Sequence, residues 1–268
     1  MVNIHIPVFY EQMMTELNQT LSELETEEID GLIIDIRDNP GGAVSALISM
    51  LSRFIPSGEV VFTNVNILGH EIPNLSGSVF DIVDVEVVIL INENSASASE
   101  VFAAAMKEVG NTEIIGTTSH KKGTAQLPVH FRDNIINLTF NEYLSPLGNR
   151  IEGYGVTPSI YVKQADFHSF SPLHLGINVI LEYDTVDSRT ANAQLILDLL
   201  GYEVNRTDGF FDTSTVDAVR EFQQNNNLTE TGYLNAETAT ALSLALLEKQ
   251  NNPTYDTQLQ AALDYFKQ

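Results

Sequence analysis

The stretch Gly31-Leu32-Ile33-Ile34-Asp35-Ile36 is a short and nearly continuous apolar run. Branched side chains at consecutive positions are typical of a strand that is buried on both faces, as in a parallel sheet covered by helices. The run stops at Asn39-Pro40-Gly41-Gly42, a strong turn signal, and residues 43–54 then show helical spacing. We therefore predict a buried strand, a tight turn and a helix.

The same order recurs on both sides of this segment. Residues 2–9 read as a strand and residues 11–24 as a helix, while residues 85–91 repeat the buried-strand pattern and residues 95–109 the helical one. Further predicted strands cover residues 114–115, 129–131 and 135–140, with a turn at Asp133-Asn134. This alternation predicts an α/β fold in which helices flank a mixed β-sheet.

Composition excludes several classes of protein. The chain of 268 residues has 13 Lys+Arg against 36 Asp+Glu, a formal net charge of −23, so binding to nucleic-acid phosphates is not expected. The absence of cysteine rules out disulfides, thiolate nucleophiles and cysteine-ligated zinc. No apolar run approaches the roughly 18 residues of a membrane helix, and we expect the chain as given to be soluble.

The pattern changes after residue 162. Residues 163–190 show no clear periodicity, but two similar blocks follow, Asp208-Gly209-Phe210-Phe211-Asp212 and Thr231-Gly232-Tyr233-Leu234-Asn235. Each places an Asx residue before a helical stretch, where its side chain can accept from free N–H groups of the first turn while the preceding apolar residue packs back onto the helix. We predict a helical module of about 60 residues, the size of many small domains, and a final helix over residues 257–266.

Chemistry is first suggested by Asn94-Ser95-Ala96-Ser97-Ala98-Ser99-Glu100, directly after a buried strand. Small residues at a strand-to-helix junction let a substrate backbone approach, and free N–H groups at the helix start can stabilise an oxyanion. Each serine could equally be only a helix cap. Glu100 has the structural alternatives of pairing with Lys107 or capping the helix.

The second suggestive stretch is His120-Lys121-Lys122-Gly123-Thr124-Ala125-Gln126. A lysine can act as the base that activates a serine if desolvation keeps its amine neutral, because an unperturbed lysine, with a pKa of ~10.4, is almost wholly charged near neutrality. Alternatively, both lysines are solvated loop charges.

Five ordered motifs resemble those of the C-terminal processing peptidases, also called tail-specific proteases, over residues 2–162. The motifs are Asp35-Ile36-Arg37-Asp38-Asn39-Pro40-Gly41-Gly42, the serine stretch, Lys122-Gly123-Thr124-Ala125-Gln126, Tyr143-Leu144-Ser145-Pro146-Leu147-Gly148 and Gly153-Tyr154-Gly155-Val156-Thr157-Pro158. The resemblance implies a layered core of the ClpP and crotonase type.

The resemblance also implies roles for individual residues. Ser97 would be the nucleophile, Lys122, 25 positions later, the base, and Gln126 the residue that orients this base. The oxyanion hole would use the backbone N–H of Ala98 and of a glycine, with Gly41 and Gly42 both open. Neither a metal nor an organic cofactor is required.

Two departures leave a second hypothesis open. His120 and Lys121 stand where relatives usually have an aromatic residue and a glycine. The sequence also starts at the strand that follows the substrate-reading PDZ domain of relatives, so either it is a fragment or it works without that domain. The alternative to an endopeptidase is therefore a degenerate, wall-associated scaffold or peptide-binding protein.

The region from about residue 191 to 247 resembles a peptidoglycan-binding module. The motifs that carry this resemblance are Leu199-Leu200-Gly201-Tyr202, Asp208-Gly209-Phe210-Phe211, Ala218-Val219-Arg220-Glu221-Phe222-Gln223, Leu228, and Thr231-Gly232-Tyr233-Leu234 with Thr238. We expect Phe210, Phe211, Phe222 and Tyr233 to fill a core rather than to stack on sugars.

Together the resemblances predict four segments. These are a catalytic core over residues 1–165, a connector over 166–190, a peptidoglycan-binding-like domain over 191–250 and a C-terminal helix over 251–268. The implied location is the bacterial cell envelope, and the implied partners are protein or peptide substrates and peptidoglycan, with homo-oligomerisation open. Deleting residues 191–268 is expected to weaken wall binding and to leave hydrolysis roughly intact.

Overall fold

The structure, a computed structural model, describes residues 1–24, 29–77, 83–132, 134–165, 167 and 170–267. The chain forms two compact units. The first, which we call the α/β unit, comprises Met1–Lys163 and Gln258–Gln268; the second, the helical unit, comprises Gln164–Thr257. The second unit is therefore inserted in sequence between two parts of the first.

A five-stranded parallel sheet forms the centre of the α/β unit, with strand order β1-β2-β5-β6-β9. Its strands are β1 (Val2–His5), β2 (Leu32–Asp35), β5 (Val87–Ile91), β6 (Glu113–Gly116) and β9 (Ile160–Tyr161). All four residues of β2 are buried, which confirms the strand covered on both faces that its apolar run predicts.

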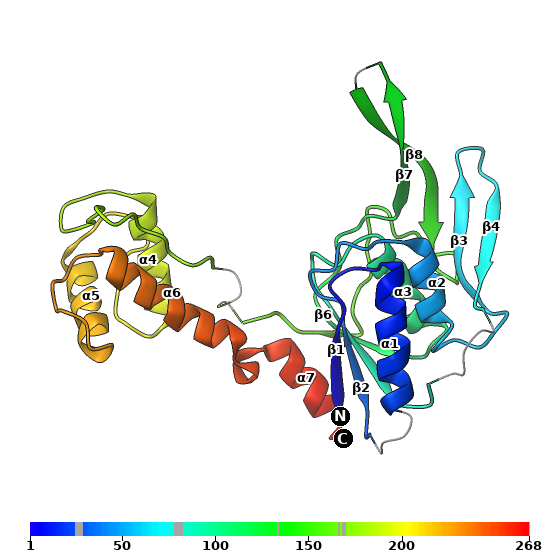
Figure 1. Cartoon of the computed structure of the whole chain (residues 1–268), viewed down its shortest axis with the longest axis horizontal. Helices are drawn as coiled ribbons and strands as arrows, with labels where there is room; N and C mark the ends of the chain where they lie inside the picture. Colours follow the sequence, from blue (N-terminus) through cyan, green and yellow to red (C-terminus); the bar gives the residue numbers. More distant parts are fainter. Residues whose placement is uncertain (25–28, 78–82, 133, 166, 168–169, 268) are drawn as a thin grey trace. The chain divides into compact units, whose positions relative to one another are not determined.

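Three helices cover one face of this sheet: α1 (Glu11–Leu24), α2 (Val44–Leu51) and α3 (Ala98–Glu108) (Figure 1). Alternate strand residues such as Ile34 and Ile89 form one core with side chains from all three helices, among them Leu21, Leu47 and Phe102. The helices predicted from periodicity are thus present, and α1 has the predicted bounds.

Helix α7 (Thr257–Tyr265) supplies the apolar partner for the other face of the sheet. Its Ala262 is fully buried in a cluster with Ile33, Val88, Leu90 and Ile115. Just beyond the helix, the Phe266 ring lies so close to Gly31 that a Cβ there would be 2.3 Å from Cε1 of the ring. The last helix is therefore part of the α/β core.

A separate antiparallel sheet has the order β4-β3-β8-β7. Its strands are β3 (Val60–Asn66), β4 (Glu71–Leu75), β7 (Thr124–Phe131) and β8 (Asn134–Leu144), and its two hairpins project from the α/β unit (Figure 1). The predicted strands at 129–131 and 135–140 are fragments of β7 and β8. Of the predicted turn between them, Asn134 is instead the first residue of β8, and Asp133 lies outside the described residues.

The helical unit contains α4 (Ser188–Leu199), α5 (Thr213–Asn225), α6 (Ala236–Asn251) and a 3-10 turn (Pro253–Tyr255). Both predicted N-caps are confirmed: Asp212 accepts from the N–H of Thr215 at 2.9 Å, and Asn235 accepts from that of Thr238 at 2.8 Å.

The two sequence blocks of this unit have matching interiors. The buried amide of Gln194 donates to Phe210 O and Thr215 Oγ1, and that of Gln223 donates to Tyr233 O and Thr238 Oγ1. Each block therefore packs a buried glutamine from the preceding helix against the backbone of its glycine turn.

The aromatic residues of the blocks divide into two groups. Phe211 and Phe222 are buried in the core of the helical unit, whereas Phe210 and Tyr233 are partly exposed. The Arg206 guanidinium lies 4.8 Å from the centroid of the Phe210 ring. Core packing thus accounts fully for only two of the four aromatic residues.

The compact units end at other positions than the predicted segments. Leu173 and Leu181 of the predicted connector are buried in the core of the helical unit, and Val186 forms a bridge with Phe210. The Gln164 side chain bonds those of Asp256 at 2.9 Å and Thr257 at 3.0 Å. The two ends of the helical unit therefore lie next to each other.

Among the described residues, every helix is too short or too polar to cross a membrane.

Candidate active site

Ser97 occupies the N-cap position of α3, immediately after the loop that follows β5. Its backbone has φ 55° and ψ −116°, a strained conformation for a residue with a side chain. The hydroxyls of its two neighbours are held by the backbone, Ser95 Oγ donating to Ile36 O at 2.8 Å and Ser99 Oγ to Asn39 O at 2.9 Å. Only Ser97 of the three serines lines the adjacent cavity.

The glycine turn lies directly against this serine. A Cβ on Gly41 would lie 2.9 Å from Ala98 N and 2.9 Å from Ser97 Cβ, and one on Gly42 would lie 1.9 Å from Phe9 O. Both glycines have positive φ, 103° and 145°, so the turn needs glycine for its conformation as well as for space. The tight turn predicted after β2 is therefore present, and it lies against the start of α3.

The two glycines differ in what their N–H groups do. The Gly41 N–H donates to Asn39 Oδ1 at 2.8 Å and is already used. Within the described part of the chain, the N–H groups of Gly42 and Ala98 donate no hydrogen bond, and both residues line the cavity. This pair of N–H groups is available to a ligand oxygen.

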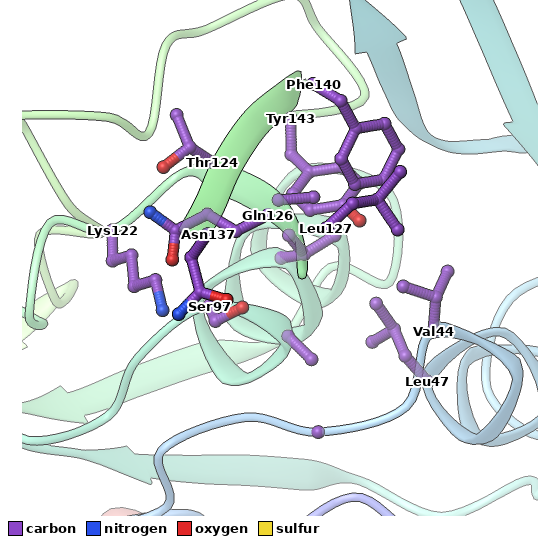
Figure 2. Close-up of a pocket in the computed structure, with 14 residues that line it drawn as sticks. Val44, Leu47, Ser97, Lys122, Thr124, Gln126, Leu127, Asn137, Phe140 and Tyr143 are labelled. Atoms are coloured by element: carbon purple, nitrogen blue, oxygen red, sulfur yellow. The ribbon is translucent and has the colours of Figure 1, made fainter. Parts of the chain in front are cut away.

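A cavity of about 420 Å³ brings most of the predicted site residues together, since Ser97, Ala98, Gly42, Lys122 and Gln126 all line it. Gly41 is not among the lining residues but supports the turn behind Ser97. The amine of Lys122 and the amide of Gln126 lie on the same side of the cavity as Ser97 (Figure 2).

The exposure of Lys122 differs from the desolvated environment that a lysine base needs. The side chains of Lys122 and Gln126 are both exposed; Lys122 lies in the segment before β7, and Gln126 lies in β7, an edge strand of its sheet. Among the described residues, no hydrogen bond joins Lys122 Nζ to Ser97 Oγ. The structure therefore shows a cavity that is open to solvent at the Lys122 side chain.

The opposite side of the cavity is apolar. Val44 and Leu47 of α2 face Leu127, Phe140 and Tyr143 of the antiparallel sheet (Figure 2). Burial raises the pKa of the Tyr143 hydroxyl, so this wall stays uncharged, and the Tyr143 ring stacks edge-on against Phe62 with centroids 5.6 Å apart. The cavity can hold an apolar side chain next to a polar reaction centre.

Some lining residues were missed by sequence reasoning. Thr124 and Tyr143 belong to two of the five motifs, but Asn137 and Phe140 were not singled out for the site. Asn137 comes from β8 and lies beside Gln126 across the hairpin, where Pro128 is its register partner. Only the observed pairing of β7 with β8 reveals its place, because Asn134 pairs with Phe131 as the first residue of β8 instead of lying in the predicted turn.

Comparison with protein families assigns both parts of the chain. Residues 1–162 match the model of peptidase family S41, and residues 187–242 match the model described as "Putative peptidoglycan binding domain".

Two curated relatives come from Bacillus subtilis. The carboxy-terminal processing protease CtpB is 34% identical over 97% of this chain and 54% of its own length, and CtpA is 31% identical over 98% and 56%. The chain thus spans about half the length of these relatives.

Solved structures give the same fold. The photosystem II D1 C-terminal processing protease has a TM-score of 0.54 and 26% identity, over 60% of this chain and 42% of that one. Mature CPAF, at 18% identity, has a TM-score of 0.52 over 59% and 46% of the two chains, and supports the fold alone.

Proposed function

Because this chain belongs to peptidase family S41, we propose that it is a serine endopeptidase with Ser97 as nucleophile, Lys122 as general base and Gln126 as the residue that orients the base. The observation that carries the proposal is a single cavity lined by all three of these side chains. The relatives CtpB and CtpA are named carboxy-terminal processing proteases, which favours C-terminal processing of protein substrates.

In the proposed reaction Ser97 Oγ attacks the scissile carbonyl while the neutral Lys122 amine takes its proton. The resulting ammonium then protonates the leaving amine, and water hydrolyses the acyl-enzyme by the reverse sequence of proton transfers. A peptide that fills the cavity would cover the exposed Lys122 side chain, so that the proton transfer takes place away from bulk water. The chemistry needs neither a metal nor an organic cofactor.

We assign the oxyanion hole to the N–H groups of Gly42 and Ala98. Both line the cavity beside Ser97, and neither is used within the described residues, whereas the Gly41 N–H donates to Asn39 Oδ1. Gly41 then has a supporting role, because its missing side chain lets the turn approach Ser97 and Ala98.

Gly41→Ala should lower the rate of hydrolysis about 100-fold, because the new Cβ would move the oxyanion donors by a few tenths of an ångström or more. Gly58→Ala is the matched control: Gly58 has a similar positive φ of 90°, but a Cβ there meets nothing within 4 Å. Initial rates of peptide hydrolysis by both variants test this. If the rate of hydrolysis falls by a similar factor in both variants, backbone strain explains the effect, and the proposed clash of the new Cβ with Ser97 and Ala98 does not.

The proposed activity is tested with β-casein as substrate for the wild type, Ser97→Ala and Lys122→Ala. Equal rates for all three would refute the assignment. The second hypothesis, a degenerate scaffold or peptide-binding protein, is favoured by the exposed Lys122 and by its missing hydrogen bond to Ser97. It predicts peptide binding without any hydrolysis that depends on Ser97.

We further propose that the helical unit binds peptidoglycan and holds the peptidase at the cell envelope. The match of residues 187–242 to a peptidoglycan-binding family supports this. The net charge of −23 makes nucleic acid an unsuitable partner.

Replacing residues 165–256 with a short Gly-Ser linker should abolish sedimentation with purified peptidoglycan while most peptide hydrolysis remains. The linker can be short because the side chains of Gln164, Asp256 and Thr257 bond one another at the two ends of the unit. A deletion of residues 191–268 is unsuitable for this test, because it also removes α7 from the α/β core. Unchanged sedimentation of the linker variant would contradict wall binding by this unit.

A further inference from the structure

Glu100 is a buried carboxylate that the proposed reaction does not use. It lies in the first turn of α3 and is fully buried. The sequence left open a pair with Lys107, but Lys107 Nζ instead donates to Thr157 O at 2.7 Å. The capping alternative describes only part of what Glu100 does.

The Glu100 carboxylate accepts four hydrogen bonds from two different loops. Its Oε2 accepts from the N–H of Ser97 at 3.0 Å and from that of Lys122 at 2.8 Å. Its Oε1 accepts from the N–H of Lys121 at 2.7 Å and from Ser119 Oγ at 2.5 Å. A single oxygen atom thus joins the backbone of the nucleophile to the backbone of the base.

The segment around Lys122 is also held by backbone hydrogen bonds. The His120 N–H donates to Ser95 O at 3.0 Å, and Lys121 O accepts from the N–H of Gly153 at 3.0 Å. Glu152 Oε2 accepts from the N–H of Gly123 at 2.7 Å, so three consecutive N–H groups, from Lys121 to Gly123, all donate to carboxylates. Beyond them β7 is an exposed edge strand. Of these bonds, the one from the Lys122 N–H to Glu100 joins the backbone of Lys122 itself to α3.

Backbone conformation gives an independent reason to assign importance to this carboxylate. Ser97 and Lys121 both have side chains and positive φ, 55° and 75°. Both also donate their N–H to Glu100. Strained residues persist only where surrounding interactions hold them, and charge-assisted hydrogen bonds are strong enough to do so.

We propose that Glu100 is a positioning residue that fixes Lys122 in reach of Ser97 through their backbones. The inference rests on the proposed peptidase function. The physical reason is that an ionised carboxylate can only accept hydrogen bonds and has about four lone-pair sites. In Glu100 all four of these sites have donors.

The test compares Glu100→Gln and Glu100→Ala with the control Glu108→Gln. In either orientation, the amide NH2 of a glutamine at position 100 faces at least one backbone N–H from which it cannot accept. Glu108 is a matched control because its carboxylate, on the same helix, also holds a loop, accepting from the Leu147 N–H and Asn149 Nδ2, both at 2.8 Å. Neither contact involves the cavity.

We expect kcat per folded molecule to fall about tenfold in Glu100→Gln and about 100-fold in Glu100→Ala, with KM changed less than about threefold. Amide hydrogen exchange should accelerate at least about tenfold at Ser97, Lys121 and Lys122 in Glu100→Ala, since all three N–H groups lose their acceptor. In Glu100→Gln the same acceleration is expected either at Lys121 or at Ser97 and Lys122, depending on which side the amide NH2 occupies. Glu108→Gln should leave kcat and these three exchange rates unchanged.

The two readouts separate the possible failures. If the wild type hydrolyses peptide through Ser97 and the Glu100 variants keep its kcat, the positioning role is wrong even if their melting temperature falls. If the wild type has no such activity, the proposed function fails, and exchange still decides the role of Glu100. Unchanged hydrogen exchange at the three amides would overturn the positioning role of Glu100. Glu100→Gln keeps the shape of the side chain and serves if Glu100→Ala does not fold.

Discussion

Ser97→Ala should reduce hydrolysis of β-casein on the order of 10⁴-fold or more, because it removes the atom that forms the acyl-enzyme. The cavity and the N–H groups of Gly42 and Ala98 remain, so binding of the substrate should change little. The measurement is kcat and KM from initial rates, together with loss of labelling by a serine-reactive fluorophosphonate. A variant that keeps even a tenth of the wild-type rate would require a different nucleophile.

The adjacent lysines allow a sharper version of this experiment. Lys122 lines the cavity and Lys121 does not, so Lys122→Ala should lose about 10³-fold in kcat while Lys121→Ala should stay within about threefold of the wild type. The double variant Ser97→Ala/Lys122→Ala should be no slower than Ser97→Ala alone, because a base without its nucleophile contributes nothing. An equal loss for both lysines would indicate a general effect of charge at this loop.

Local patterns in the sequence were sufficient for much of the fold. Apolar spacing gave α1 its bounds, the branched run predicted β2, and Asp212 and Asn235 are N-caps, because each of these depends on residues close together in the chain. Strands β3 and β4 were missed. Their residues are largely exposed or partly buried, so they show no clean alternation between a core face and a solvent face.

In the candidate site, too, the sequence predicted some features and missed others. The resemblance to the C-terminal processing peptidases selected Ser97, Lys122 and Gln126, and the structure brings them to one cavity. The sequence could not choose between Gly41 and Gly42, since the choice depends on the side chain of Asn39. It also gave Glu100 only local partners, because its bonds to Ser119, Lys121 and Lys122 join residues about 20 positions apart.

Removal of residues 258–268 should unfold the α/β unit. The segment covers Ile33, Val88, Leu90 and Ile115, all fully buried. Exposing four such side chains costs about 1.5–3 kcal/mol each, or about 6–12 kcal/mol in all, which matches the roughly 5–15 kcal/mol that stabilises a whole domain. Gln258 would also be lost, with its bonds to Arg37 Nη1 at 3.3 Å and Val162 O at 2.9 Å.

A point variant tests the same interface without shortening the chain. Ala262→Asp places a carboxylate in an apolar cluster and should lower the free energy of unfolding by about 3–5 kcal/mol. Asp264→Ala on the exposed side of α7 removes only a surface ion pair with Lys267 and should cost less than about 1 kcal/mol. Urea unfolding followed by circular dichroism measures both. Similar midpoints for the two variants would contradict burial of this face.

The linker variant that lacks residues 165–256 but retains α7 shows whether the location of a deletion or its length decides the stability of the α/β unit. It removes 92 residues, 256 − 165 + 1, against 11 for the deletion of 258–268. If stability depended on chain length, the larger deletion would be the more harmful. Because α7 covers the sheet, we expect the opposite order: a folded, hydrolytically active α/β unit after the large deletion and an unfolded one after the small deletion.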